Sequence, residues 1–219
     1  MSEIAACCCD FAADYELNAH PAFARLERRV LGCAYGGTSW TTRAQADRYA
    51  PLLELDDGQR LLELGSGAGW PGIYIAARSG AKLTMVDLPF IALSRALERA
   101  SEELRTPTTA IQASAAALPF TGRGFDAIEH SDVLCCLPEK REMLAECRRV
   151  ARPGARMLFY VIAPAPGLQG ADMAEATETG PPFVDLDGTY QDMLADTGWN
   201  LLQREDLSAE YLETLRRMV

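Results

Sequence analysis

The sequence predicts an α/β fold: a doubly wound, mostly parallel sheet with helices on both faces and an N-terminal helical lid. Two observations favour this fold class. From Arg60 onward, short apolar segments alternate with longer amphipathic ones. The joints between them are short and contain glycine or proline. Such strand–helix alternation is typical of parallel strands whose connecting helices cover both faces of the sheet.

The chain length fits a single domain. Its 219 residues lie within the usual size of one domain, and a chain of this length buries roughly 70% of its surface on folding. We expect one domain over residues 1–219, with a helical lid at 1–56, a ligand-binding core at 57–162 and a C-terminal part with a substrate-side insert at 163–219.

Hydrophobic spacing defines the individual elements. We expect strands at 60–64, 82–86, 108–112, 125–130, 156–162 and 199–205. We expect helices at 71–79, 90–104, 138–151, 187–197 and 208–219. Before the first strand, residues 10–32 have helical spacing interrupted at Asn18 to Pro21, and Thr42 is suited to cap a helix that runs to about Leu55. Residues 163–186 are too long for a bare connection, and long loops of this kind are usually functional or mobile.

Composition narrows the function classes. The formal net charge of −10 disfavours binding to a phosphate backbone, so a small-molecule substrate is the better expectation than nucleic acid. No apolar run reaches the ~18 residues of a membrane span, and the first residues have no basic and apolar pattern of a secretion signal. Seven cysteines without a CxxC pair favour free thiols, a cytoplasmic location and no metal site. The oligomeric state is left open.

The chemistry concentrates in a glycine loop after the first strand. Leu64 is followed by Gly65-Ser66-Gly67-Ala68-Gly69, and then by a helical segment. Glycines allow positive φ and close approach of a ligand to the backbone, and a helix start offers free N–H donors. Asp87 ends the next strand about 20 residues later, where a carboxylate can accept both hydroxyls of a ribose; it could instead cap the helix that starts near Phe90.

A nicotinamide-dependent oxidoreductase is one alternative. Residues Gly67 to Gly72 formally match GxGxxG, the dinucleotide fingerprint. The first glycine after the strand is however Gly65, and counting from it places Trp70 where the third glycine should be. The register for a pyrophosphate is therefore poor.

Five segments in order resemble the class I S-adenosylmethionine-dependent methyltransferases of the small-molecule type. They are ELGSGAG at 63–69, MVDLP at 85–89, ASAAALPF at 113–120, GFDAIEHSDVLCCLP at 124–138 and ECRRVARPGARMLF at 146–159. The resemblance implies a Rossmann-like domain that transfers a methyl group from S-adenosyl-L-methionine to a small acceptor, leaving S-adenosyl-L-homocysteine. A protein that binds the donor without catalysis is the second alternative.

The resemblance also implies which residues bind the donor. They are Glu63, Gly65, Ser66, Gly67 and Gly69 near the amino-acid end, Asp87 at the ribose, Leu88, Ser114, Ala115 and Ala116 near the adenine, and His130 and Ser131 near the methyl group. Ser114 replaces an aspartate that many relatives have at this position, so we expect a weaker adenine contact there. Family sheets also end with a seventh, antiparallel strand, which has no counterpart in this sequence, and truncation is the explanation that we favour.

Few residues are suited to act on the acceptor. Methyl transfer from a sulfonium mainly needs alignment of the reactants, and a general base matters only for a protonated, poor nucleophile. His130 and Asp132 are the two catalytic candidates. His130 could instead be hydrogen-bonded within its loop or to the donor, and Asp132 could instead cap the next short turn. Tyr35 and Trp40 flank a glycine pair in the expected lid, where aromatic faces attract cations; simple packing is the alternative role.

Overall fold

The computed structural model describes the backbone of residues 3–218 and the side chains of residues 11–218. Its centre is a five-stranded parallel sheet of order β3-β2-β1-β4-β5. The strands are β1 (Arg60–Leu64), β2 (Lys82–Asp87), β3 (Thr109–Gln112), β4 (Phe125–Ser131) and β5 (Ala151–Tyr160). The chain winds outward from β1 to β3 and returns to β4, so the direction of winding reverses between β1 and β4. Ligands of open α/β sheets bind at such a reversal, outside the carboxyl ends of the strands.

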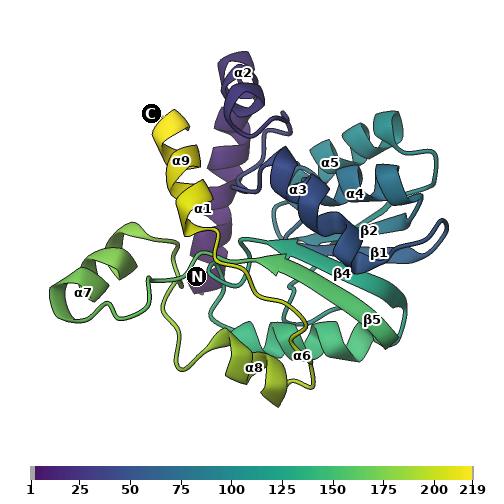
Figure 1. Ribbon diagram of the computed structural model, residues 1–219. Coiled ribbons are helices and arrows are strands. Elements are labelled where there is room, and N and C mark those ends of the chain that lie inside the picture. The colour runs from purple at the N-terminus through teal and green to yellow at the C-terminus, as the bar shows by residue number, and fades with distance from the viewer. Residues whose placement is uncertain (1–2, 219) are drawn as a thin grey trace.

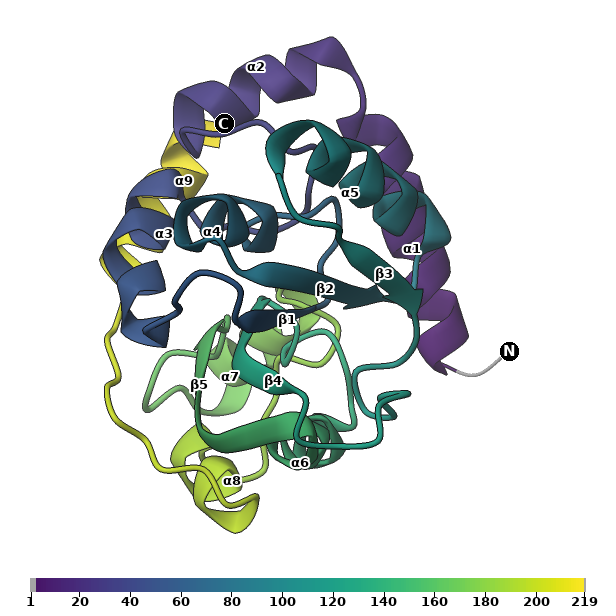
Figure 2. The ribbon, with the colours of Figure 1, turned by 90° about the vertical axis from the view of Figure 1, so that its right-hand side faces the viewer.

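Helices cover both faces of the sheet, as expected for a doubly wound fold. Helices α4 (Gly72–Ser79) and α5 (Phe90–Glu103) lie on one face, and α6 (Lys140–Val150) and α8 (Tyr190–Asp196) lie on the other (Figure 2). Neighbouring strand residues point to opposite faces: Leu61 packs into the core with Ile73 of α4, whereas Leu62 packs into the core with Leu144 of α6. Both faces are therefore apolar, and the predicted fold class is confirmed.

The segments before β1 form the expected helices. Helix α1 (Glu3–Asn18) and helix α2 (Pro21–Val30) are separated by a short break at which the His20 ring accepts a hydrogen bond from the N–H of Ala22. Helix α3 (Arg43–Tyr49) begins with a capping box, in which Thr42 and Gln45 bind each other's main-chain N–H, and continues into the 3-10 helix η1 (Ala50–Leu53). The predicted cap at Thr42 is confirmed.

The predicted strand at 199–205 is wrong. These residues run without pairing to the sheet, and β5 is its last strand among the described residues. The apolar residues Leu201 and Leu202 are 43% and 76% exposed. An apolar pattern becomes a strand only by pairing with a neighbour, and these residues do not pair with β5 although β5 is an edge of the sheet. Strand β5 also begins at Ala151, five residues before the predicted start at 156.

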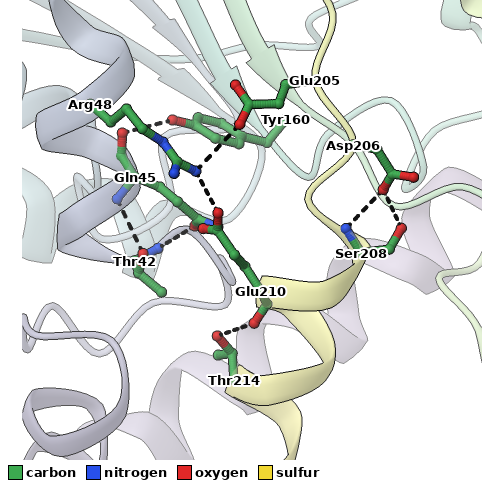
Figure 3. A network of polar contacts seen from close by, with 9 residues as sticks. All are labelled: Thr42, Gln45, Arg48, Tyr160, Glu205, Asp206, Ser208, Glu210 and Thr214. Atoms are coloured by element: carbon green, nitrogen blue, oxygen red, sulfur yellow. Dashed lines mark hydrogen bonds and ion pairs between the residues drawn. The ribbon is translucent and has the colours of Figure 1, made fainter.

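The remaining segments lie beside the carboxyl ends of the strands. The arrowheads of β4 and β5 point toward α1 and toward α9 (Ser208–Met218), and α7 (Gly170–Thr179) projects to one side (Figure 1). Helix α9 is joined to α3 by Glu210, whose carboxylate accepts hydrogen bonds from Arg48 at 2.7 Å and from the amide of Gln45 at 3.0 Å (Figure 3). Within residues 3–218, none of the helices has the length and apolar character to cross a membrane.

Candidate active site

A cavity of about 900 Å³ lies at the carboxyl ends of the strands, where the winding reverses. One end of it is formed by the glycine loop, the end of β2 and residues 113–115. The rest of the wall is formed by α1, which reaches the glycine loop through Tyr15, and by α2, the segment after β4, residues 162–165 and 176–184, and α9. Ligand cavities commonly have volumes of roughly 300–1,000 Å³, so this one has room for a large ligand or for two smaller ones.

The glycine loop presents main chain to the cavity. Gly65 and Gly67 have φ values of +59° and +51°, and a Cβ at Gly67 would lie 2.5 Å from the hydroxyl oxygen of Tyr15. The loop therefore excludes side chains at these positions for two reasons, backbone conformation and space. Between them, Ser66 lines the cavity and its buried hydroxyl has no hydrogen-bond partner in the described part of the chain. An unsatisfied hydroxyl beside bare backbone fits a polar ligand group.

Asp87 stands at the end of β2 with both carboxylate oxygens oriented by main-chain donors. The N–H of Gly67 donates to Oδ2 at 2.6 Å, and the N–H of Leu88 donates to Oδ1 at 2.7 Å. Burial raises the pKa of Asp87 to about 6, although these two hydrogen bonds lower it. Each oxygen keeps a lone pair for a further donor. Helix α5 has no side-chain cap, so the alternative role of Asp87 as its cap is wrong.

The predicted adenine contacts are only partly at the cavity. Leu88, Ser114 and Ala115 line it, whereas Ala116 does not. The N–H of Ala116 donates to the hydroxyl of Ser114 at 3.2 Å, so that N–H group is already used within the turn. We therefore withdraw Ala116 from the expected contacts, because its donor is satisfied and it lies outside the cavity wall.

Ser131 and Asp132 reach the cavity from the end of β4. The Ser131 hydroxyl donates to the buried carboxylate of Glu129 at 2.6 Å. Asp132 has a φ of +60°, and its Oδ2 accepts hydrogen bonds from the N–H of Trp40 at 3.0 Å and the hydroxyl of Ser39 at 3.3 Å. Burial raises the pKa of Asp132, and the two hydrogen bonds lower it. Asp132 thus fixes the segment before α3 against the end of β4.

The prediction that His130 acts at the cavity, as a catalytic residue or a donor contact, is wrong. His130 is 0% exposed and absent from the cavity wall, and its ring stacks on Phe159 with centroids 4.8 Å apart. Burial lowers the pKa of His130 to about 3, so its ring is neutral. The physical reason is strand alternation: since Ser131 points toward the cavity, the preceding residue of β4 points into the core.

Two residues of the glycine motif act behind the loop, in contrast to their predicted contact with the donor. Glu63 is buried, and its carboxylate accepts a hydrogen bond from the N–H of Gly72 at 2.6 Å, at the start of α4. Burial and the neighbouring carboxylate of Glu129 raise the pKa of Glu63 well above its usual range. A Cβ at Gly69 would lie 2.2 Å from the side chain of Ile73, so this glycine permits close packing of α4. Neither residue lines the cavity.

The two aromatic residues predicted for the lid have different surroundings. Tyr35 lies outside the cavity wall: its hydroxyl donates to Glu103 at 2.9 Å and its ring packs against Trp70 at 4.9 Å, so packing is its role. Trp40 does line the cavity and meets Tyr211 of α9 edge-on, with ring centroids 5.6 Å apart.

Several residues of the wall were not predicted from the sequence. They are Phe11, Tyr15, Asn18, Phe23 and Leu26 of α1 and α2, Leu137 after β4, Phe183 of the insert, and Tyr211 and Met218 of α9. The helical spacing of apolar residues in 10–32 showed an apolar face without showing its partner, and the expected substrate-side insert at 163–219 named the segment without its contact residues.

Comparison with known proteins agrees with this architecture. A family model described as a methyltransferase domain matches residues 62–159. The 27-O-demethylrifamycin SV methyltransferase of Amycolatopsis mediterranei (strain S699) is 30% identical over 174 residues, which are 77% of this chain and 63% of that protein. The sterol methyltransferase-like 1 of Botryococcus braunii is 32% identical over 127 residues, 55% of this chain and 33% of that protein. The chain thus covers less than two thirds of these relatives.

Solved structures share the fold. Haemonchus contortus phosphoethanolamine N-methyltransferase 2, in complex with phosphomonomethylethanolamine and S-adenosylhomocysteine, superposes with a TM-score of 0.74 at 20% identity, covering 90% of this chain and 46% of that one. Geranyl diphosphate C-methyltransferase of Streptomyces coelicolor A3(2), in complex with Mg²⁺, geranyl diphosphate and S-adenosyl-L-homocysteine, has a TM-score of 0.71 at 16% identity, covering 93% of this chain and 76% of that one. Residues 62–159 thus match a methyltransferase domain, and the sheet order and the glycine loop agree with that match.

Proposed function

We propose that this chain transfers a methyl group from S-adenosyl-L-methionine to a small molecule held in the same cavity. The observation that carries the proposal is a single cavity whose wall contains the glycine loop and Asp87 together with many apolar side chains. When bound, S-adenosyl-L-methionine supplies a methyl group on a sulfonium, already activated for direct displacement. The solved neighbours hold S-adenosylhomocysteine, and matched residues 62–159 include the loop and Asp87.

The residues at the cavity wall have the chemistry that the donor needs. Gly65, Ser66 and Gly67 would hold its amino-acid end by main-chain groups and the Ser66 hydroxyl. Asp87 would accept hydrogen bonds from the ribose hydroxyls, and Leu88, Ser114 and Ala115 would surround the adenine. Glu63 and Gly69 would act indirectly, because they hold the start of α4 behind the loop.

The chain itself would contribute orientation and exclusion of water. Holding two reactants in line is worth several kcal/mol in a displacement of this kind. Ser131 and Asp132 would lie near the transferred methyl group, and Asp132 is placed to accept a proton if the acceptor is a hydroxyl. Carboxylates at Asp87 and Asp132 also favour a cationic sulfonium nearby by Coulomb attraction.

We extend the proposal to organisation and location. Residues 1–219 would act as one domain, in which 1–56 and 163–219 enclose the acceptor and 57–162 hold the donor. Seven cysteines without a CxxC pair favour a reducing, cytoplasmic location. The net charge of −10 favours a small acceptor over nucleic acid.

Calorimetry with S-adenosyl-L-methionine and with S-adenosyl-L-homocysteine tests donor binding, and NADH serves as the control ligand for the oxidoreductase alternative. We expect saturable binding of the first two ligands and none of NADH. Absence of binding at millimolar concentrations contradicts the proposal. Incubation with methyl-labelled donor and a metabolite extract then tests transfer: labelled product supports catalysis, and binding without any labelled product supports the non-catalytic alternative.

A further inference from the structure

We propose that the acceptor end of the cavity binds a lipophilic molecule that carries no negative charge, and that it rejects phosphorylated and other anionic acceptors. This inference rests on the proposed function, because it names the class of acceptor for the same site. It follows from three features of the wall: apolar side chains at the acceptor end, the lack of a cation, and the presence of carboxylates.

Apolar side chains from four separate segments form the acceptor end. They are Phe23, Leu26 and Leu31 from α2 and the turn after it, Leu137 after β4, Ile162, Phe183 and Val184 from the segment after β5, and Tyr211 and Met218 from α9. Contact with apolar surface favours ligands in proportion to the apolar area that they remove from water. A wall of this composition suits a hydrocarbon or ring body, and the wall offers it few polar groups.

The wall contains no lysine, arginine or histidine among residues 11–218. The basic side chains behind it are engaged elsewhere. The Nζ of Lys140 donates to the main-chain carbonyls of Leu137 at 3.1 Å and Phe183 at 2.7 Å. Arg99 donates to the main-chain carbonyl of Ala68 at 3.0 Å. These cations therefore hold the wall together from outside and do not offer a donor to a ligand phosphate.

Carboxylates give the cavity a negative character. Asp14, Glu27, Asp87, Asp132 and Glu139 all line it. Glu27 is 3% exposed, and its carboxylate accepts hydrogen bonds from the N–H groups of Gly36 at 2.8 Å and Gly37 at 3.3 Å. These N–H groups hold the carboxylate in place and are not available to an anion. An incoming phosphate would lose its hydration and gain no opposite charge, which is unfavourable in a partly dry cavity.

Matched pairs of ligands test the charge preference. The protein is saturated with S-adenosyl-L-homocysteine and titrated by calorimetry with 1-naphthol against 1-naphthyl phosphate, and with geraniol against geranyl phosphate. We expect each neutral member to bind at least about 100-fold more tightly than its phosphate, in line with the cost of juxtaposing like charges. Equal or tighter binding of the phosphates overturns the inference.

A substitution that adds a cation to the wall gives an independent test. Thr179 is an exposed residue at the end of α7 that lines the cavity, whereas Thr177 is exposed on the same helix and lies outside the wall. Their hydroxyls make equivalent bonds, to the main-chain carbonyls four residues earlier. We expect Thr179→Lys to reduce the ratio of the affinities for 1-naphthol and 1-naphthyl phosphate by about tenfold, because the new ammonium attracts the phosphate. We expect Thr177→Lys to leave this ratio unchanged. An equal effect of both substitutions contradicts the inference.

The outcome for the donor separates the two proposals. If S-adenosyl-L-homocysteine binds and neither 1-naphthol nor geraniol binds, the inference about the acceptor fails and the proposed function stands. If S-adenosyl-L-homocysteine does not bind, the proposed function fails, and titration of the donor-free protein with 1-naphthol and 1-naphthyl phosphate still measures the charge preference of the cavity.

Discussion

The N–H of Gly67 donates a hydrogen bond to the Asp87 carboxylate at 2.6 Å, which ties the glycine loop after β1 to the end of β2. The residue proposed to hold the ribose therefore also holds the loop proposed to surround the amino-acid end of the donor. A change at Asp87 acts on both parts of the donor site, and so does its state of protonation.

Asp87→Asn should weaken binding of S-adenosyl-L-homocysteine by about 1–3 kcal/mol, the usual cost of leaving buried donors without a charged acceptor. In the wild type, the affinity should fall as the pH drops through about 6, because a protonated Asp87 accepts hydrogen bonds less well. Calorimetry between pH 5 and 8 measures both effects. Asp56→Asn, at an exposed aspartate far from the cavity wall, is the matched control. If the affinity of Asp87→Asn for S-adenosyl-L-homocysteine varies with pH as that of the wild type does, Asp87 is not part of the donor site.

The same raised pKa has a consequence for stability. Because the pKa of Asp87 is raised on folding, the folded chain binds a proton more readily than the unfolded chain between about pH 4 and 6. The contribution of Asp87 to the free energy of unfolding therefore falls as the pH rises through that window. Urea denaturation at several pH values measures the free energy of unfolding of both proteins. The value for the wild type should fall relative to that for Asp87→Asn as the pH rises.

Gly67→Ala should destabilise the chain and abolish donor binding, since the new Cβ would lie 2.5 Å from the Tyr15 hydroxyl oxygen. Backbone strain at positive φ alone costs about 1–3 kcal/mol. Gly58→Ala isolates this component, because Gly58 has a φ of +76° and no atom within 4 Å of a new Cβ. Addition of Tyr15→Phe should partly restore the stability of Gly67→Ala. Equal losses in Gly67→Ala and Gly58→Ala, measured by chemical denaturation, would contradict the close contact.

His130→Leu should change the acid stability of the chain and leave donor binding at pH 7 unaltered. Burial lowers the pKa of His130 to about 3 in the folded chain. As the pH falls, His130 is therefore protonated in the unfolded chain before it is protonated in the folded chain. This stability is fully present above about pH 6.5 and is lost toward pH 3, at up to about 1.4 kcal/mol per pH unit. Unfolding free energies at pH 4, 5 and 7 should therefore fall less steeply in His130→Leu than in the wild type. His20→Asn, which retains an N-cap at an exposed position, should leave the free energy of unfolding at pH 7 unaltered.

Glu210→Ala should loosen α9, since the Glu210 carboxylate joins it to Arg48 and Gln45 of α3. We expect faster hydrogen exchange of the amides of residues 208–218 and weaker binding of 1-naphthol, because Tyr211 and Met218 of this helix line the cavity. The global free energy of unfolding should change by no more than about 1 kcal/mol, as is usual for exposed ion pairs. Glu213→Ala removes a carboxylate on the same helix whose one ion pair among the described side chains is with Arg216 at 4.0 Å, and it should leave exchange and binding unchanged.

The parts of the fold that local patterns determine were predicted well. Strand β1 has the predicted bounds, and the cap at Thr42 is present, because apolar alternation and capping chemistry act over a few neighbouring residues. The strand prediction at 199–205 failed because pairing with the edge strand β5 depends on where the chain carries these residues, and no pattern within Trp199 to Glu205 reports that position.

The candidate site was predictable in part for the same reason. Gly65, Ser66, Gly67 and Asp87 were found because two strand ends of a parallel sheet lie at the same edge. His130 was placed wrongly because both faces of β4 are covered. Apolar residues therefore lie on both faces of β4, and the sequence of this strand does not indicate which residue at its end points toward the cavity. Phe183 and Tyr211 were missed because their contact with the cavity depends on how distant segments pack.

The first and last described helices, α1 and α9, both contribute to the cavity wall, α1 through Phe11 and Tyr15 and α9 through Tyr211 and Met218. During synthesis on the ribosome, the glycine loop and Asp87 emerge long before α9 does. The nascent chain can thus present the donor half of the site while the acceptor half still lacks a side. Enclosure of both ligands, and with it protection of the reacting groups from water, is complete only when α9 has packed beside α2.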